Sequence, residues 1–318
     1  MSLTKPRTVS LEEFNQIFES VKNWGRWGLD DQIGTLNYIT PEKVRAAASL
    51  VKTGRRVSLG LPINKVAGPD NPHQAIHFLT QGHDIDIGSS GVRFALDFMG
   101  MACHGDCHTH VDALCHISYR GLTYNGKKAE EVVTSLGATT QDIAAYTTGV
   151  VGKGVLLDVP RLRGVKWLDP GDAVTRAELE ACEQAQNVHL GEGDILVFRT
   201  GHARRRNELG PWLNSPPPSG EGKAGLHVDS IPWMHERKIA AFLPDGDGEA
   251  VPSLVEGVPY PIHPLQIVAM GLLASDSLQF EDLVQACEAE GRYEFMVVGL
   301  PLLLPGGTGS PWNPIAIF

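Results

Sequence analysis

The chain has 318 residues, a length that fits one large domain or two closely packed ones and that can bury a substantial core. Hydrophobic residues make up 42% and charged residues 20%, which is ordinary globular composition and excludes collagen-like, coiled-coil and disordered chains. Because phosphate binding needs a positive surface, the formal net charge of −10 argues against a nucleic-acid partner, and we expect a small-molecule substrate.

The N-terminal part of the chain predicts two helices. Residues Leu11 to Val21 have an amphipathic pattern. A second helix is predicted over Glu42 to Lys52, with Thr40 as its N-cap, Pro41 in its first turn and Gly54 beyond its end. We therefore expect residues 1–55 to form a helical extension that packs on the rest.

Strand-like and helical segments follow one another through the remainder of the chain. Strands are predicted at Arg56 to Pro62, Phe94 to Val111, Gly154 to Val159, Asp194 to Arg199, Ala240 to Leu243 and Phe295 to Leu303. Helices are predicted at Ala129 to Leu136, Arg176 to Gln186, Ser230 to Arg237, Leu265 to Leu273 and Phe280 to Glu290. The pattern predicts a single mixed α/β domain over residues 1–318 without a nucleotide-binding glycine motif, and Gly68 to Gly91 and Gly210 to Gly225 are predicted surface loops.

Cysteine usage and hydropathy indicate the cellular compartment in which we expect the protein. The five cysteines are odd in number and follow no disulfide framework, which favours a reducing, cytoplasmic setting. The first 23 residues have no apolar segment typical of a signal peptide, and no run is long enough to cross a bilayer. We expect neither secretion nor a membrane partner.

The segment from Met101 to His116 carries the chemistry. Every even position from 104 to 112 is a histidine or an aspartate, namely His104, Asp106, His108, His110 and Asp112. In an extended strand these side chains share one face, while Met101, Cys103, Cys107 and Val111 face the core. Burying so many polar groups without compensation is very unfavourable, and a divalent cation compensates for several at once.

The geometry of a strand limits which of these residues share one ion. The face is roughly 26 Å long at a rise of ~3.3 Å per residue, whereas metal–ligand bonds are about 2.0–2.2 Å. His110 and Asp112 can share an ion, and His104 or His116 joins them only if the backbone bends, for example at Gly105. The number of ions, one or two, stays open at this stage.

The same segment is compatible with other kinds of site. The histidines could lie on a solvent-facing edge strand, or Cys103, Cys107 and Cys115 could help to form a structural zinc site or supply a nucleophile. The sequence His108-Thr109-His110-Val111-Asp112 is also similar to the metallo-β-lactamase pattern His-x-His-x-Asp-His, but Ala113 stands where that pattern has its last histidine.

The chain resembles the cyclase-like metal-dependent hydrolases, the family of bacterial kynurenine formamidase and isatin hydrolase, and particularly its longer members. Thr109-His110-Val111-Asp112 and His116 match the family motif His-x-Gly-Thr-His-x-Asp-x-Pro-x-His, whose first histidine falls on Asp106. Further similarity lies at Trp24-Gly25-Arg26-Trp27-Gly28, Tyr124-Asn125-Gly126 and Gly309-Ser310-Pro311-Trp312-Asn313-Pro314. The resemblance implies a swivelling β/β/α-like fold and a homo-oligomer.

The resemblance also implies further site residues, His263 and Asp276. Together with the motif it predicts Zn²⁺ or Mn²⁺ held by His110, Asp112 and either His104 or Asp106, with His116 or His263 moving protons during hydrolysis of an amide, cyclic amide or lactone. A metal-dependent binding protein without turnover is the alternative from another class. Two further candidates are His227 and the acidic loop with Asp245, Asp247 and Glu249, which we interpret as a solvated turn.

Overall fold

A nine-stranded mixed sheet forms the centre of the structure, a computed structural model that describes residues 6–85 and 91–318. Its strands run in the order β1-β15-β13-β7-β9-β11-β12-β4-β14. Their bounds are β1 (Arg56–Ser58), β4 (His110–Asp112), β7 (Val150–Asp158), β9 (Ile195–Arg199), β11 (Ala241–Pro244), β12 (Leu273–Asp276), β13 (Glu294–Gly299), β14 (Gly309–Pro311) and β15 (Ile315–Ile317). Neighbours among β7, β9, β11 and β12 are parallel, and the remaining pairs are antiparallel. The predicted mixed α/β class is confirmed.

The central strands are buried on both faces. In β9, Leu196 and Phe198 point into one hydrophobic core, while Ile195 and Val197 point into the other. This is why the strand is a continuous apolar run rather than an alternating one, as expected for a parallel strand covered on both sides.

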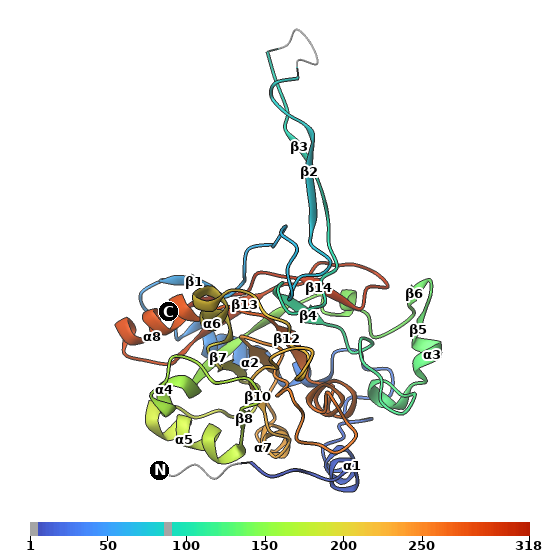
Figure 1. Cartoon of the computed structure of the whole chain (residues 1–318), viewed down its shortest axis with the longest axis vertical. Coiled ribbons are helices and arrows are strands. Elements are labelled where there is room, and N and C mark those ends of the chain that lie inside the picture. Colours follow the sequence, from blue (N-terminus) through green and yellow to red (C-terminus); the bar gives the residue numbers. More distant parts are fainter. Residues whose placement is uncertain (1–5, 86–90) are drawn as a thin grey trace.

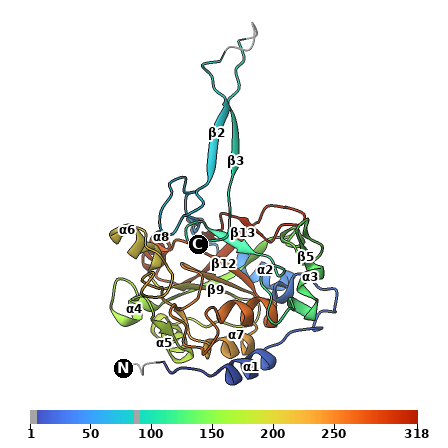
Figure 2. The same ribbon diagram turned by 45° about the vertical axis from the view of Figure 1, so that its right-hand side comes forward.

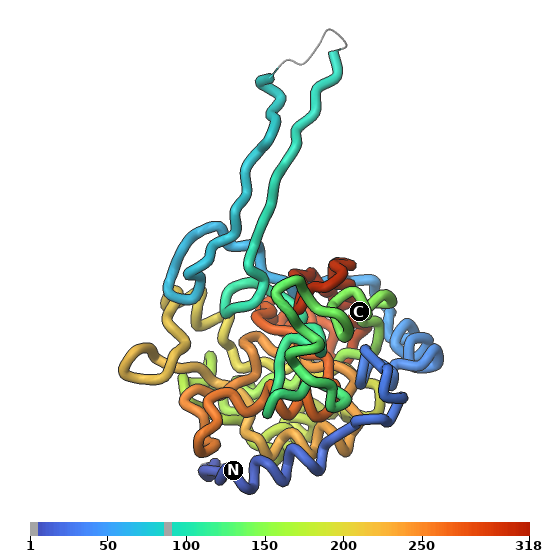
Figure 3. Tube along the Cα trace, turned by 90° about the vertical axis from the view of Figure 1, so that its right-hand side faces the viewer, coloured from blue at the N-terminus to red at the C-terminus, as the bar shows by residue number. Residues whose placement is uncertain are grey.

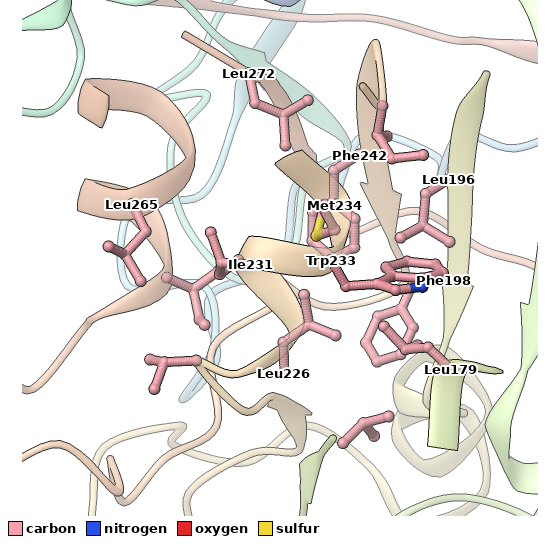
Figure 4. Close-up of a cluster of buried hydrophobic side chains, with 14 of the residues drawn as sticks. Leu179, Leu196, Phe198, Leu226, Ile231, Trp233, Met234, Phe242, Leu265 and Leu272 are labelled. Atoms are coloured by element: carbon pink, nitrogen blue, oxygen red, sulfur yellow. The ribbon is translucent and has the colours of Figure 1, made fainter. Parts of the chain in front are cut away.

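Helices cover both faces of this sheet (Figure 1). Their bounds are α1 (Leu11–Ser20), α2 (Pro41–Ala48), α3 (Ala129–Val132), α4 (Val159–Arg163), α5 (Arg176–Gln186), α6 (His202–Leu209), α7 (Ser230–Glu236) and α8 (Glu281–Glu290), with a π-helix at Pro264–Met270. The first core joins α1, α5, α7 and the π-helix to the sheet, with Trp233 fully buried (Figure 4). Within the described part of the chain, no helix combines the length and hydropathy needed to span a bilayer.

Helix starts follow the capping residues seen in the sequence. The Thr40 hydroxyl accepts a hydrogen bond from the Lys43 amide at the start of α2, and Pro41 occupies its first turn. Thr175 and Glu178 form a reciprocal capping box at the start of α5. The predicted bounds of α1, α5, α7 and α8 are accurate to within a residue or two, whereas α2 ends four residues before the predicted Lys52.

An extended hairpin, β2 (Ile76–Gln81) with β3 (Leu96–Gly100), projects far from the globular body (Figures 1, 2 and 3). Two predictions are wrong here. Gly68 to Gly91 is not only loop, since it contains β2, although its residues 86–90 lie outside the described residues. Phe94 to Val111 is not one strand, because β3 ends at Gly100 and β4 begins at His110 in a different sheet.

Two further predicted helices are shorter than expected. Ala129 to Leu136 is helical only to Val132, after which β5 (Val133–Thr134) and β6 (Gly137–Ala138) form a small hairpin. The β-branched Val133 and Thr134 and the positive φ of Gly137 favour that turn. Leu265 to Leu273 ends at Gly271, which adopts a left-handed conformation, and β12 begins at Leu273. A second small pair joins β8 (Ala173–Val174) to β10 (Gly225–Leu226).

Candidate metal centre

The short strand β4 brings the motif to the centre of the site. It lies between β12 and β14, and its register places His110 opposite Asp276 and Asp112 opposite Gly309. Alternation along the strand directs Val111 into the second core, where it is fully buried, and His110 and Asp112 to the other face. Flanking hydrogen bonds fix this strand: the Thr109 hydroxyl donates to the Ser277 carbonyl at 2.6 Å.

Side chains with ligand atoms converge on both sides of Asp112. One group consists of His104, Asp112 and His116, and the other of His110, Asp112 and Asp276, with the ligand atoms in each group within 4.8 Å of one another. Asp112 Oδ1 lies 3.1 Å from His104 Nδ1 and 3.6 Å from His110 Nε2. His110 Nε2 lies 3.5 Å from Asp276 Oδ2. Imidazole and carboxylate ligands of this kind suit zinc, manganese and related divalent ions.

The Asp112 carboxylate gives the strongest indication of a cation site. Asp112 is 1% exposed, and neither of its oxygens has a hydrogen-bond partner among the described residues. The nearby His104 Nδ1 is also buried and is not aligned for a hydrogen bond with it. Buried carboxylates are normally hydrogen-bonded or bound to metal, so this donor set fits a divalent cation.

Backbone contacts orient His110 and His104. The Nδ1–H of His110 donates to the His108 carbonyl at 2.8 Å, which leaves Nε2 facing the two carboxylates. His104 Nε2 contacts the Thr308 hydroxyl at 3.1 Å. A Cβ at Gly309 would lie 2.5 Å from His104 Cε1, so the close approach of β14 requires glycine at this position.

His104 and His116 form a stacked pair whose protonation states differ. Their rings are nearly parallel, with centroids 3.8 Å apart. Burial lowers the pKa of His116 to about 4. Burial also opposes charge on His104, but the adjacent Asp112 carboxylate and the Cys103 thiol outweigh it and raise that pKa to about 10. Near neutral pH, the ring beside Asp112 therefore carries the positive charge of the pair, and the ring of His116 is neutral.

His263 is held by a buried glutamate that the sequence reading did not assign to the site. Glu249 is 0% exposed, and its Oε1 accepts hydrogen bonds from the His263 backbone amide at 2.9 Å and from His263 Nδ1–H at 2.8 Å. His263 Nε2 then lies 3.7 Å from Asp276 Oδ2. Burial opposes charge on His263, but Asp276 and Glu249 together raise its pKa well above the usual value. Burial raises the pKa of Asp276.

Asp106 is separated from the ligand groups by an ion pair. Its Oδ1 lies 3.1 Å from the ammonium of Lys223, which is 4% exposed and also contacts the Asp247 carboxylate. Asp247 Oδ1 in turn accepts the Glu249 amide at 3.0 Å. Lys223 thereby connects the loop that carries His104 to the loop that orients His263.

The expected solvated turn at Asp245, Asp247 and Glu249 is wrong. Asp245 is 1% exposed and accepts hydrogen bonds from the backbone amides of Thr200, Gly201 and His202, at the start of α6. The three carboxylates thus have separate structural partners: α6 for Asp245, Lys223 for Asp247 and His263 for Glu249. They do not form a second cation site.

The alternating face predicted for residues 104–112 is also not what the structure shows. The chain from 101 to 109 is irregular, with Gly105 at φ +140°. The backbone therefore bends at Gly105, a position where glycine adopts a positive φ without strain. His108 points away and contacts the Asn64 carbonyl through Nε2 at 3.1 Å. The structure thus brings together His104, His110, Asp112, His116, His263 and Asp276, and leaves Asp106 outside.

Other candidates lie elsewhere. His227 contacts the Arg7 carbonyl and Asp229, outside both ligand groups. Within the described residues, no cysteine joins either ligand group. A cavity of about 370 Å³ opens beside His116 and His263. Its other lining residues are Ile117, Val258, Pro259, Tyr260 and Pro264.

Known proteins of one family match this chain in sequence and in fold. Residues 36–247 match the sequence model of the Cyclase family. A solved structure described as a novel cyclase is 35% identical, with a TM-score of 0.83 over 93% of this chain and 99% of that one. No curated protein sequence matches.

Isatin hydrolases share the fold at lower identity. One bound to the product analogue thioisatinate is 20% identical, with a TM-score of 0.57 over 85% of this chain and 93% of that one. Isatin hydrolase A from Ralstonia solanacearum is also 20% identical, with a TM-score of 0.58 over 87% and 97%. The resemblance drawn from the motifs is confirmed: the chain belongs to the Cyclase family.

Proposed function

We propose that this protein is a metal-dependent hydrolase that opens an amide, cyclic amide or lactone bond of a small cyclic or aromatic substrate. The observation that carries the proposal is the buried Asp112 carboxylate, whose oxygens form no hydrogen bond with any described residue and lie among imidazole rings. His104, His110 and Asp112 would hold the cation, with His116 and Asp276 adjacent. When bound, a zinc or manganese ion lowers the pKa of water and polarises a carbonyl group.

The residues of the chain supply orientation and proton transfer. The His108 carbonyl fixes the His110 ring through Nδ1, and Glu249 fixes His263 in the same way. Because Nδ1 of His263 is engaged, the proton that this ring gives to a departing amine or alkoxide is the one at Nε2. His116, whose pKa is lowered to about 4, is neutral near pH 7, so its ring can accept a hydrogen bond from water without becoming charged.

The cavity indicates the class of substrate. Ile117, Val258 and Pro259 provide apolar walls beside the two histidines, and the half-exposed ring of Tyr260 can stack on a flat substrate. These side chains exclude water from one side of the site while the histidines face it. An apolar, ring-containing carbonyl compound is the substrate that such a pocket favours.

The test combines metal binding with turnover. We expect metal-free protein to bind Zn²⁺ or Mn²⁺ in calorimetry and then to hydrolyse N-formylkynurenine, isatin or a dienelactone-type compound, whereas Asp112→Asn loses both properties. Asp30→Asn is the matched control, because the Asp30 side chain is fully exposed.

Two outcomes would count against the proposal. Full activity of Asp112→Asn would contradict it. Metal and ligand binding without hydrolysis of any carbonyl substrate would instead indicate a binding protein. The metallo-β-lactamase-like alternative has no support, since His108 faces away from the site and the chain belongs to another family.

A further inference from the structure

The N-terminal segment, residues 7–24, lies against the outside of the cavity beside His116 and His263. It comprises α1 and the residues on either side of it, and it precedes residues 36–247, which match the family model. Its large apolar side chains are buried in the first core, namely those of Val9, Phe14, Phe18 and Val21. No residue of this segment lines the cavity itself. We call it the N-terminal brace, because it is bonded to all three walls of the cavity from behind.

The first wall, which contains Ile117, is held through Tyr119. The Tyr119 hydroxyl donates a hydrogen bond to Asn15 Oδ1 of α1 at 2.7 Å. The Tyr119 ring also meets Phe14 edge-on, with centroids 5.6 Å apart, and Phe18 at 5.0 Å. Because Tyr119 follows Ile117 by only two residues, these contacts limit how far the first wall can move.

The second wall runs from Val258 to Tyr260 and is held through Val9. The Val9 amide donates to the Leu254 carbonyl at 2.8 Å, and the Glu256 amide donates to the Val9 carbonyl at 3.0 Å. These two bonds form a parallel bridge between Val9 and Val255. The bridge lies three residues before Val258, so it fixes the position from which the second wall starts.

The third wall is the start of the π-helix, and the brace holds the other end of that helix. The Trp24 Nε1–H donates to the Val268 carbonyl at 2.7 Å. The Asn23 amide and side chain donate to the carbonyls of Ala269 and Met270 at 3.0 and 2.9 Å. Carbonyls in the last turn of a helix have no partner within it, so these donors complete the helix end. Figure 2 shows α1 beside the orange segment that contains the π-helix.

We propose that the N-terminal brace is a positioning element that sets the width of the substrate cavity and hence the size of the ring system that it accepts. The proposal rests on the proposed function, because it takes this cavity as the substrate site. A closely packed core transmits the shift of one element to its neighbours. One methylene group in an apolar pocket changes selectivity about 10- to 200-fold, so small changes in wall spacing decide which substrates fit.

Hydrogen exchange tests whether the brace holds the walls. Val9→Ala/Tyr119→Leu removes side-chain contacts to two walls, and Tyr119→Phe is a milder variant that removes only one hydrogen bond. We expect amide exchange to become roughly tenfold faster in the three wall segments of the double variant, and to a smaller extent in Tyr119→Phe. These segments are residues 117–122, 254–260 and 264–270.

Val155→Ala is the matched control for exchange. It truncates a fully buried valine of the same core, but in β7, and should leave exchange in the wall segments unchanged. Wall segments that exchange in the double variant as slowly as in the unmodified chain would overturn the proposal.

Steady-state kinetics of the metal-loaded protein tests the effect on substrate choice. In Val9→Ala/Tyr119→Leu, KM for isatin should rise about tenfold at unchanged kcat and metal content. The kcat/KM for the bulkier N-benzylisatin should rise relative to that for isatin. Val155→Ala should keep both KM values although it lowers the unfolding free energy. Faster exchange with an unchanged KM would show that the brace only stabilises the fold, which would overturn the proposal.

Failure of the proposed function gives a different result. An unmodified chain that hydrolyses no carbonyl substrate would contradict that function, and the Kd for isatin, measured by calorimetry, would then replace KM in the comparison of variants. A chain that does not bind isatin either would overturn both proposals.

Discussion

Two segments that are close in sequence depart from ordinary burial in opposite directions. Around β4, the carboxylate of Asp112 is almost fully buried without a hydrogen-bond partner. In the projecting β2–β3 hairpin, called the arm below, Phe78 and Phe98 are about half exposed. Folding of a single chain satisfies neither set of groups. The first fits a cation, and the second leaves stacked aromatic rings in contact with solvent, so the two segments depart from ordinary burial for different chemical reasons.

The largest expected effect comes from Asp112→Asn. The substitution removes the negative charge that favours a cation, so we expect kcat/KM to fall at least ~10³-fold and metal-dependent stabilisation, about 4 kcal/mol at metal concentrations near 1,000 times Kd, to disappear. Calorimetric unfolding with and without metal measures this. A Tm that still rises with metal in the variant would separate Asp112 from the site.

A buried imidazole outside the site, that of His202, links burial to the pH dependence of stability. Burial, with Lys223 nearby, lowers the pKa of His202 to about 4. Because the folded pKa is below the unfolded value near 6.5, the stabilising contribution of His202 is present above pH 6.5 and is lost as the pH falls towards 4, by up to about 3 kcal/mol.

His202→Phe should therefore lose less stability than the unmodified chain between pH 7 and pH 4.5. Denaturant unfolding at both pH values measures the difference, and His189→Phe, at an exposed histidine, is the control. An unchanged pH dependence in His202→Phe would contradict the assignment.

Glu249→Gln tests the orientation of His263. Partners that orient site histidines typically contribute 10- to 100-fold, so we expect kcat to fall by about that factor while metal content stays unchanged. The raised pKa of His263 should also fall, which proton NMR of the ring can follow. A variant that loses its metal as well would place Glu249 in the support of the ligands themselves.

The smallest expected effects are the losses of unfolding free energy from one truncation in each of the two segments. Val111 is fully buried behind the metal face, so Val111→Ala should cost about 2 kcal/mol of unfolding free energy. Leu79→Ala in the exposed arm should cost less than about 0.5 kcal/mol. Denaturant unfolding gives both values, and equal costs would remove the contrast between the segments.

Local patterns were enough to predict much of the fold. The capping residue Thr40 placed the start of α2, and the segment Asp194 to Arg199 predicted the strand β9. The β2 strand was missed because its sequence shows no regular alternation of apolar and polar residues. Its side chains are also not buried in a core. Long-range pairing cannot be read from local sequence either, and β4 takes its place from β12 and β14.

In the candidate site, too, local sequence predicts some residues, and long-range contacts determine the others. The motif located His110, Asp112 and His116, because ligand-type residues at this density are rarely structural. The choice of His104 over Asp106 depends on Lys223, more than a hundred residues away, whose charge holds Asp106 outside the ligand groups. Glu249 looked like a turn residue, and only the packing of His263 against it reveals its place beside the site.

The pairing of β4 with β14 has a consequence for biosynthesis. His110 lies opposite Pro311, and His104 contacts Thr308, so the two ends of this contact are separated by roughly two hundred residues of chain. Domains generally fold as units once their sequence has left the ribosome. The strand that supports the candidate ligands is therefore missing from the nascent chain until residue 311 has emerged, so the ordered site forms only after residues 104 to 311 have been translated.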